Sequence, residues 1–163
     1  MIVIKDTVTI KTTSSDVFNW FAHLDENYLS WHPSHVSCRY LKKNTLEVGA
    51  ILYAEEYLHG KLHKLKFNLT NVIPNQGFQY RLMPGINGGF QFFENTKGVD
   101  VKAELRIGWD IPFIGAFIDK IMSLLLFNHI KALKQHMREE GNNLRSLLEQ
   151  GKPTNNNIQN NAV

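Results

Sequence analysis

Cysteine is almost absent from this sequence of 163 residues, in which Cys38 is the only one. A lone cysteine cannot form an internal disulfide, and it excludes a zinc site built on paired cysteines. Long hydrophobic runs are missing too: the N-terminus alternates apolar and polar residues, unlike a secretory signal, and no run approaches the about 20 apolar residues that span a bilayer. We therefore expect a cytoplasmic protein without a membrane span.

Charge of one sign is equally scarce. Lys and Arg number 18 against 15 Asp and Glu, for a formal net charge of +3. Because no basic cluster is interleaved with aromatic residues, we predict no nucleic-acid binding. Hydrophobic residues make up 43% of the chain, enough for one well-packed core. We predict a single domain over residues 1–150 and a disordered, Asn-rich tail at 151–163.

The spacing of apolar residues predicts an α+β protein. Alternation over Ile2–Ile10 indicates a first strand, and a short helix is expected at Val17–Leu24. Six strand-like runs follow, separated by turn residues typical of antiparallel connections: Val36–Leu41, Ala50–Leu58, Leu62–Val72, Phe78–Met83, Gly89–Glu94 and Val99–Trp109. A helical period covers Phe117–Glu149, with a break considered at Gly141. This order predicts a curved antiparallel sheet of six to seven strands wrapped around a long C-terminal helix, with a cavity between them.

The predicted C-terminal helix carries ionisable residues on its apolar stripe. At about 100° per residue, one stripe contains Met122, Leu125, His129, Leu133, His136, Glu140 and Leu147. Because four of these are apolar, the stripe should face the core. His136 and Glu140 are spaced i, i+4 and point the same way. A buried carboxylate needs a proton, a cation or a metal, so this pair indicates half of a metal site.

Two other segments offer the missing ligands. His32 and His35 flank a Pro-stiffened turn in the Trp-His-Pro-Ser-His segment at residues 31–35. In the strand Ala50–Leu58, alternation turns either Glu55 or Glu56 inward. We favour Glu56, because Glu55 would bring Tyr53 and Tyr57 inward, and tyrosines tolerate an outer face. Two His and two carboxylates suit zinc, and also manganese or iron(II).

Each of these pieces also has an ordinary explanation. An i, i+4 His-Glu pair is common on solvated helix faces, and Glu55-Glu56 is compatible with a solvated strand end near a hairpin. His32 fits a cap or a packing partner for Trp31, and His129 fits a core histidine bonded to a carbonyl. The metal site is favoured because the pieces meet in one predicted cavity.

The order of elements resembles the START-like, birch-pollen-allergen superfamily with its helix-grip fold, over most of residues 1–149. The Trp-His-Pro-x-His motif, an inward Glu and the late His-x-x-x-Glu resemble the diacetylphloroglucinol and phloretin hydrolase family. Those enzymes cleave a carbon–carbon bond between an aromatic ring and an acyl group, bind zinc through two His and two Glu, and are longer. The resemblance implies as ligands one His of the motif, Glu56, His136 and Glu140. His35, which opens a strand, is better placed than His32.

Three functions follow as hypotheses. The first is a divalent-metal hydrolase, with zinc as the expected cofactor, acting on a small aromatic or acyl-ketone substrate, with His63 moving a proton and His129 acting as a second acid–base or supporting group. The second is a non-catalytic carrier of a small hydrophobic ligand. Further residues expected to line its cavity are Leu65, Phe67, Leu69, Phe90 and Phe92, with Tyr53, Tyr57, Tyr80 and Cys38 as additional candidates. The third is an interaction module, in which the apolar segment Phe113–Phe127 packs on a partner, on a second subunit in a homodimer, or as a flap over the sheet.

Overall fold

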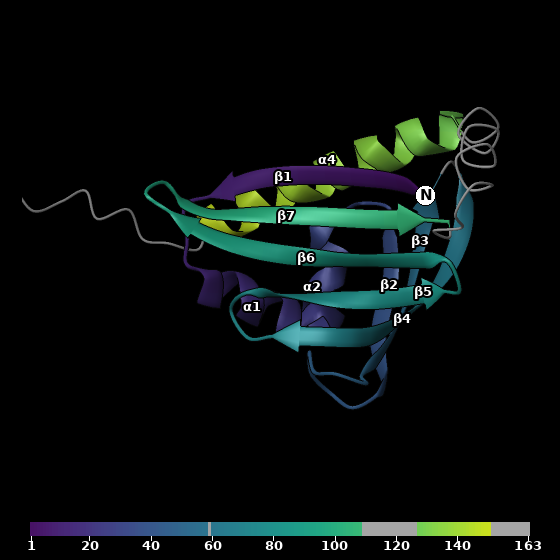
Figure 1. Ribbon diagram of the computed structural model, residues 1–163, viewed down its shortest axis with the longest axis horizontal. Helices are drawn as coiled ribbons and strands as arrows, with labels where there is room; N and C mark the ends of the chain where they lie inside the picture. The colour runs from purple at the N-terminus through teal and green to yellow at the C-terminus, as the bar shows by residue number, and fades with distance from the viewer. Residues whose placement is uncertain (59, 109–126, 151–163) are drawn as a thin grey trace, which may run out of the picture.

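A computed structural model describes residues 1–58, 60–108 and 127–150. In this part of the chain, seven strands form one antiparallel sheet in the order β1-β7-β6-β5-β4-β3-β2 (Figure 1). The strands are β1 (Ile2–Ile10), β2 (His35–Lys42), β3 (Ile51–Leu58), β4 (Lys61–Ile73), β5 (Gly77–Met83), β6 (Ile86–Asn95) and β7 (Gly98–Ile107). The predicted α+β class and antiparallel sheet are confirmed. Strands β2 to β7 lie side by side in the sheet in the same order as in the sequence. Strand β1 pairs with β7 instead.

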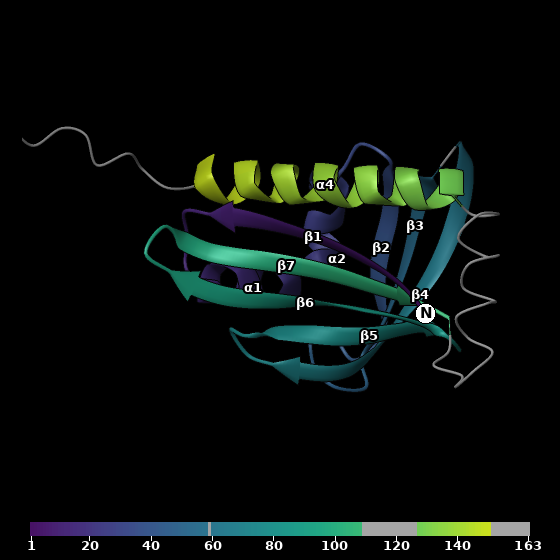
Figure 2. The same ribbon diagram turned by 45° about the horizontal axis from the view of Figure 1, so that its top comes forward.

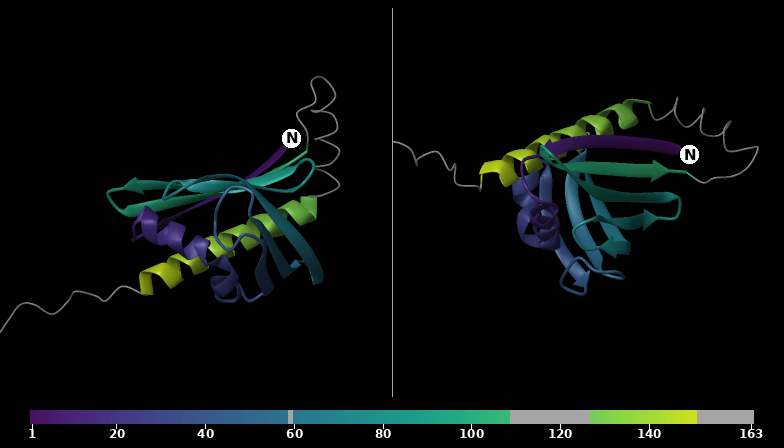
Figure 3. Two further views of the ribbon diagram at one scale, coloured as in Figure 1. Left: turned by 90° about the horizontal axis from the view of Figure 1, so that it is seen from below. Right: turned by 60° about the vertical axis from the view of Figure 1, so that its left-hand side comes forward.

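The C-terminal helix α4 (Phe127–Gln150) crosses the inner face of the curved sheet, beside β1 (Figure 2). Seen from below, it runs diagonally under the sheet, with the short helices at one end (Figure 3). This is the predicted wrapping of a sheet around a long helix. The expected helix start at Phe117, most of the apolar segment Phe113–Phe127 and the tail at 151–163 lie outside the described residues. The single domain, the homodimer and the cytoplasmic location stay predictions.

Two short helices replace the single one predicted at Val17–Leu24. Helix α1 (Ser14–Ala22) begins at a capping box, in which the Thr13 side chain accepts from the Asp16 N–H and the Asp16 carboxylate accepts from the Thr13 N–H. Helix α2 (Leu24–Trp31) follows at once. No second helix was predicted directly after Leu24. The helical form of α2 goes with the burial of Tyr28 and Trp31 in the core.

The core beneath the sheet is rich in aromatic rings. Phe21 on α1 is fully buried, and its ring lies 4.7–5.9 Å, centroid to centroid, from five other aromatic rings: Trp20, Trp31, Phe78, Phe90 and Phe92. These rings join α1, α2, β5 and β6 into one packed unit. No helix in the described residues is long and apolar enough to cross a membrane.

The break considered at Gly141 is not present, because α4 runs continuously through it. Gly141 instead allows close packing against β1. A Cβ at this position would lie 3.3 Å from Asp6 Oδ2 and 3.4 Å from Val8 Cγ1. The residue is therefore explained by the approach of the helix to the sheet and not by a bend in the helix.

We expect Gly141→Leu to lower the free energy of unfolding by about 1–3 kcal/mol, because the larger side chain must push α4 away from Asp6 and Val8. Gly141→Ala is the control and should be close to neutral, since a small steric cost is offset by about 1 kcal/mol of better helix propensity. Urea denaturation measures both. Equal stabilities for the two variants would mean that α4 does not approach β1 this closely.

Candidate metal centre

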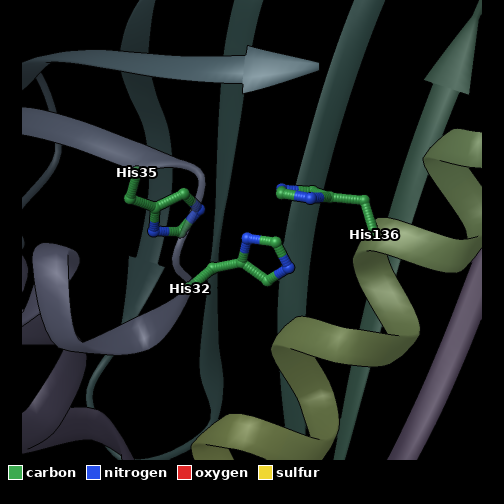
Figure 4. A group of neighbouring side chains, drawn as sticks. All are labelled: His32, His35 and His136. Carbon is green, nitrogen blue, oxygen red and sulfur yellow. The ribbon is translucent and has the colours of Figure 1, made fainter. Parts of the chain in front are cut away.

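Four side chains from three separate elements converge near the middle of α4. They are His35 at the start of β2, Glu56 in β3, and His136 and Glu140 on α4, and their ligand atoms all lie within 4.8 Å of one another. His35 Nε2 is 3.2 Å from Glu140 Oε1 and 3.7 Å from Glu56 Oε2. His136 Nε2 is 3.5 Å and 3.9 Å from the same two oxygens. Figure 4 shows His136 reaching from α4 toward His32 and His35.

Strand register brings His35 and Glu56 together. The two residues are direct partners across β2 and β3, so their side chains share a face. Leu52 and Ala54, at the same parity as Glu56, are buried, which confirms the prediction that Glu56 points inward. Glu55 lies on the outer face, where it accepts a hydrogen bond from Tyr53 and pairs with a lysine of β4.

Helix α2 orients the imidazole of His35. Its Nδ1 donates to the Tyr28 carbonyl at 2.8 Å, and its ring stacks on the Tyr28 ring, with centroids 3.8 Å apart. Because a carbonyl only accepts, Nδ1 carries the hydrogen and Nε2 presents its lone pair to the centre. The Tyr28 hydroxyl donates in turn to Glu56 Oε2 at 2.9 Å. Tyr28 thus positions two of the four groups.

The segment that leads into His35 is hydrogen-bonded to α4, the helix that carries His136 and Glu140. Trp31 Nε1 donates to the Glu140 carbonyl at 2.9 Å, and Asn143 Nδ2 donates to the Trp31 carbonyl at 2.9 Å. Trp31 is buried, so these bonds form away from competing water. The separation between His35 and Glu140 is therefore set by direct bonds. Neither Tyr28 nor Trp31 was predicted to support the site, because the sequence shows no periodicity linking them to α4.

Two nitrogens at the centre lack hydrogen-bond partners. Within the described residues, Nε2 of His35 and Nε2 of His136 are the buried side-chain polar atoms without one. They lie 3.2–3.9 Å from carboxylate oxygens, but none of these contacts satisfies both the distance and the direction of a hydrogen bond. Leaving such a group unsatisfied costs about 1–3 kcal/mol. Two imidazole lone pairs facing two carboxylates are the pattern expected of ligands that await a cation.

The spacing of these atoms fits a metal. In a tetrahedral zinc site with ligands at about 2.0–2.2 Å, neighbouring ligand atoms are about 3.3–3.6 Å apart. The four measured separations, 3.2, 3.5, 3.7 and 3.9 Å, surround that range. Two carboxylates and two neutral imidazoles also carry the charge that balances a divalent ion. The donor set and its spacing therefore fit the predicted zinc site.

The pKa values of the two helix residues show how the centre is balanced without metal. For His136, burial lowers the pKa, but Glu140, Glu56 and Glu139 outweigh burial and raise it above its usual value. For Glu140, burial raises the pKa, but the neighbouring imidazoles of His136 and His35 outweigh burial and lower it. The carboxylates thus make it easier for His136 to take up a proton in the metal-free protein. A divalent ion would compete with a proton for His136 Nε2.

His32, the alternative ligand, is already engaged. Its Nδ1 lies 2.6 Å from Ser34 Oγ and accepts from the Ser34 N–H at 3.1 Å. Its Nε2 therefore carries the hydrogen and donates to Glu139 at 3.1 Å. The ligand atoms of His32, His35 and His136 also lie within 4.8 Å of one another. Because both nitrogens of His32 have partners, the geometry favours His35 as ligand and His32 as a neighbour packed against His136.

The two predicted acid–base histidines are not members of the four-residue cluster. His63 is the cross-strand partner of Glu56, but it is exposed and does not line the cavity. The prediction that His129 faces the core is wrong, because its side chain is exposed. It has the expected angular position but lies two turns nearer the helix start, beyond the cavity lining. Catalytic roles for both stay predictions. Leu144, 1% exposed, takes the buried helix position that the predicted stripe omitted.

An apolar cavity of about 130 Å³ adjoins the centre, between α4 and the sheet. Glu56, His136 and Glu140 form part of its wall. Four of the five apolar side chains predicted to line the cavity do so, namely Leu65, Phe67, Leu69 and Phe90. The additional candidates Cys38 and Tyr80 line it as well. The fifth, Phe92, is buried in the core instead. Tyr53 and Tyr57 were wrongly considered for the lining, since their strand parity turns them outward. An engineered cavity of about 150 Å³ holds benzene, so the space suits one ring.

No family model matches the sequence, and no curated protein matches it significantly. Solved structures do match. Ara h 8.0201 is 9% identical with a TM-score of 0.59, and the match covers 92% of this chain and 99% of that one. A protein from Staphylococcus saprophyticus is 17% identical with a TM-score of 0.64, covering 92% and 93%. The di-domain ARO/CYC BexL from the BE-7585A biosynthetic pathway is 14% identical with a TM-score of 0.65, and this chain spans about half of it, with coverages of 93% and 51%. These likenesses show the fold.

Proposed function

We propose that this protein, which has the helix-grip fold, is a metal-dependent hydrolase that acts on a small aromatic or acyl-ketone substrate in its internal cavity. Zinc is the metal that we expect. The observation that carries the proposal is the pair of unpartnered buried nitrogens, on His35 and His136, that face the carboxylates of Glu56 and Glu140. These four residues would hold the ion at the wall of the apolar cavity.

Zinc is favoured over manganese and iron(II) by the number and spacing of the donors. All three metals accept imidazole and carboxylate, but zinc is the one that commonly accepts four ligands in a tetrahedron. If a further coordination position stays open to substrate or water beside these four ligands, a bound divalent ion would supply Lewis acidity toward a carbonyl oxygen or lower the pKa of a water molecule. The resemblance of the Trp-His-Pro-x-His and His-x-x-x-Glu motifs to carbon–carbon hydrolases supports hydrolysis as the reaction class.

The chain's own residues would prepare the site for this chemistry. The Tyr28 carbonyl keeps His35 in the tautomer whose Nε2 is free, and the Tyr28 hydroxyl holds Glu56 Oε2 in place. Burial and the nearby carboxylates raise the pKa of the Tyr28 phenol, so this hydroxyl remains a donor. The apolar lining would bind a ring and exclude water from its far side. A substrate would thus be held with its polar end toward the four-residue cluster.

Adjacent carboxylates of β3 give a matched test of the metal site. We expect wild-type protein, purified without a His tag and loaded with zinc, to retain about one zinc per chain. Glu56→Gln should weaken zinc binding by at least about 100-fold, because it removes a charged ligand from the cluster. Glu55→Gln should bind like the wild type, since Glu55 lies on the outer face. Elemental analysis after dialysis against a weak chelator measures the retained metal.

Two results would contradict the metal site. One is a zinc content far below one per chain in the wild-type protein after loading. The other is equal retention by the Glu56→Gln and Glu55→Gln variants. Circular dichroism of each metal-free variant shows whether it is folded, so that loss of metal is not confused with loss of structure.

A carrier function without chemistry is the second candidate, and the predominantly apolar lining of the cavity favours it. It predicts that a small hydrophobic molecule co-purifies with the protein and remains bound after the metal is removed. Native mass spectrometry of untreated and chelator-treated protein separates the two functions.

A further inference from the structure

Tyr80 on β5 is held in an unusual position on the cavity wall. It pairs across the sheet with Gly88 of β6, and its ring lies directly over that glycine. A Cβ added to Gly88 would lie 2.4 Å from the Tyr80 Oη and 2.5 Å from its Cζ, closer than non-bonded atoms can approach. On another side, the ring meets Phe67 edge-on, with centroids 5.0 Å apart. The absence of a side chain at residue 88 is therefore what admits the tyrosine ring.

The Tyr80 hydroxyl has no hydrogen-bond partner in the described part of the chain. The other packed tyrosines differ in this respect. Tyr28 donates to Glu56, Tyr40 to the Ala22 carbonyl and Tyr53 to Glu55. Tyr57 is 50% exposed and can bond to water. Tyr80 is half-buried and lines the apolar cavity, and its hydroxyl makes no hydrogen bond within the described residues, so it is available to water or to a bound ligand.

The charge around Tyr80 keeps this hydroxyl a donor. Burial raises the pKa of the phenol, and the carboxylates of Glu140 and Glu56 raise it further. Tyr80 thus lines the same cavity as Glu56 and Glu140, and the negative charge of these carboxylates acts on its hydroxyl. Leu69, Phe78 and Phe90, which also line the cavity, offer no side-chain acceptor. A ligand is the natural source of the missing acceptor.

We propose that Tyr80 determines ligand specificity by donating a hydrogen bond to an oxygen on the ligand, whose other polar group faces His35, Glu56, His136 and Glu140. The metal-facing half of this statement rests on the proposed function. The ligand class is a single-ring compound with oxygen substituents at two separated positions, since a cavity of about 130 Å³ suits one ring. A site built to bond an oxygen discriminates against the analogue that lacks it, because the donor is then left unpaired.

Matched variants and probes test this role. Tyr80→Phe removes the hydroxyl and keeps the ring over Gly88, while Tyr40→Phe makes the same change outside the cavity lining. Benzohydroxamate and its 3-hydroxy and 4-hydroxy derivatives are titrated calorimetrically into the zinc-loaded proteins. At least one hydroxy derivative should bind about tenfold more tightly than benzohydroxamate to the wild type and to Tyr40→Phe. In Tyr80→Phe this preference should vanish, with benzohydroxamate itself unchanged.

The same preference in Tyr80→Phe as in the wild type, or no preference in the wild type, would overturn the proposal. A parallel titration of chelator-treated protein with phenol and toluene, followed by NMR, separates it from the metal function. If no zinc binds but phenol is preferred only while Tyr80 is present, the Tyr80 inference holds in a carrier protein. If zinc binds, and the binding of neither the hydroxybenzohydroxamates nor phenol depends on Tyr80, the Tyr80 inference fails and the metal function stands.

Discussion

Zinc is expected to raise the midpoint of thermal unfolding of the metal-free protein by roughly 8–16 °C when free zinc is about 1,000 times its dissociation constant. At that ratio binding stabilises the folded state by about 4 kcal/mol, because an unfolded chain does not assemble the four ligands. In the metal-free protein two carboxylates lie together beside imidazoles with unpartnered nitrogens. The ion would remove that repulsion and satisfy both nitrogens.

His136→Asn and His129→Asn are the matched variants for this prediction. They lie on the same helix face, but His136 is buried within the cluster and His129 is exposed two turns away. We expect the zinc-induced shift to disappear in His136→Asn and to persist in His129→Asn. Differential scanning calorimetry with and without zinc makes the comparison. Equal shifts in both variants would place the bound zinc outside the cluster.

Phe21→Ala is expected to lower the free energy of unfolding by about 3–5 kcal/mol, the largest effect that we predict for a single core substitution. The Phe21 ring is fully buried and contacts five aromatic rings, among them Trp31. Removing it leaves a void that these rings cannot easily fill, because each is held by other contacts. Since Trp31 bonds to the Glu140 carbonyl, zinc affinity should fall as well.

Phe93→Ala provides the control. Phe93 lies on β6 like two of the Phe21 contacts, but its strand parity turns it to the outer face, where it is 52% exposed. Its removal should change the unfolding free energy by less than about 1 kcal/mol. Guanidinium denaturation measures both variants. A Phe21→Ala loss no larger than that of Phe93→Ala would show that the aromatic cluster contributes little to stability.

The sequence by itself determined which side of an element each candidate ligand occupies. The period of two along β3 separates Glu56 from Glu55, and the helical period puts His136 and Glu140 on one face. These periods follow from local backbone geometry, which depends on near neighbours in the chain. The same local signals, with the turn residues between them, were enough to predict the antiparallel sheet and the long C-terminal helix.

Only the tertiary structure decided what each side chain meets. His32 and His35 are alike in sequence, and the choice between them depends on a backbone N–H at Ser34 and a carbonyl at Tyr28. His129 has the angular position of a core residue, but it lies beyond the cavity lining. The unpaired hydroxyl of Tyr80 depends on a glycine across the sheet. Periodicity gives a direction relative to one element, whereas contact requires knowing how far the neighbouring elements extend and how closely they approach.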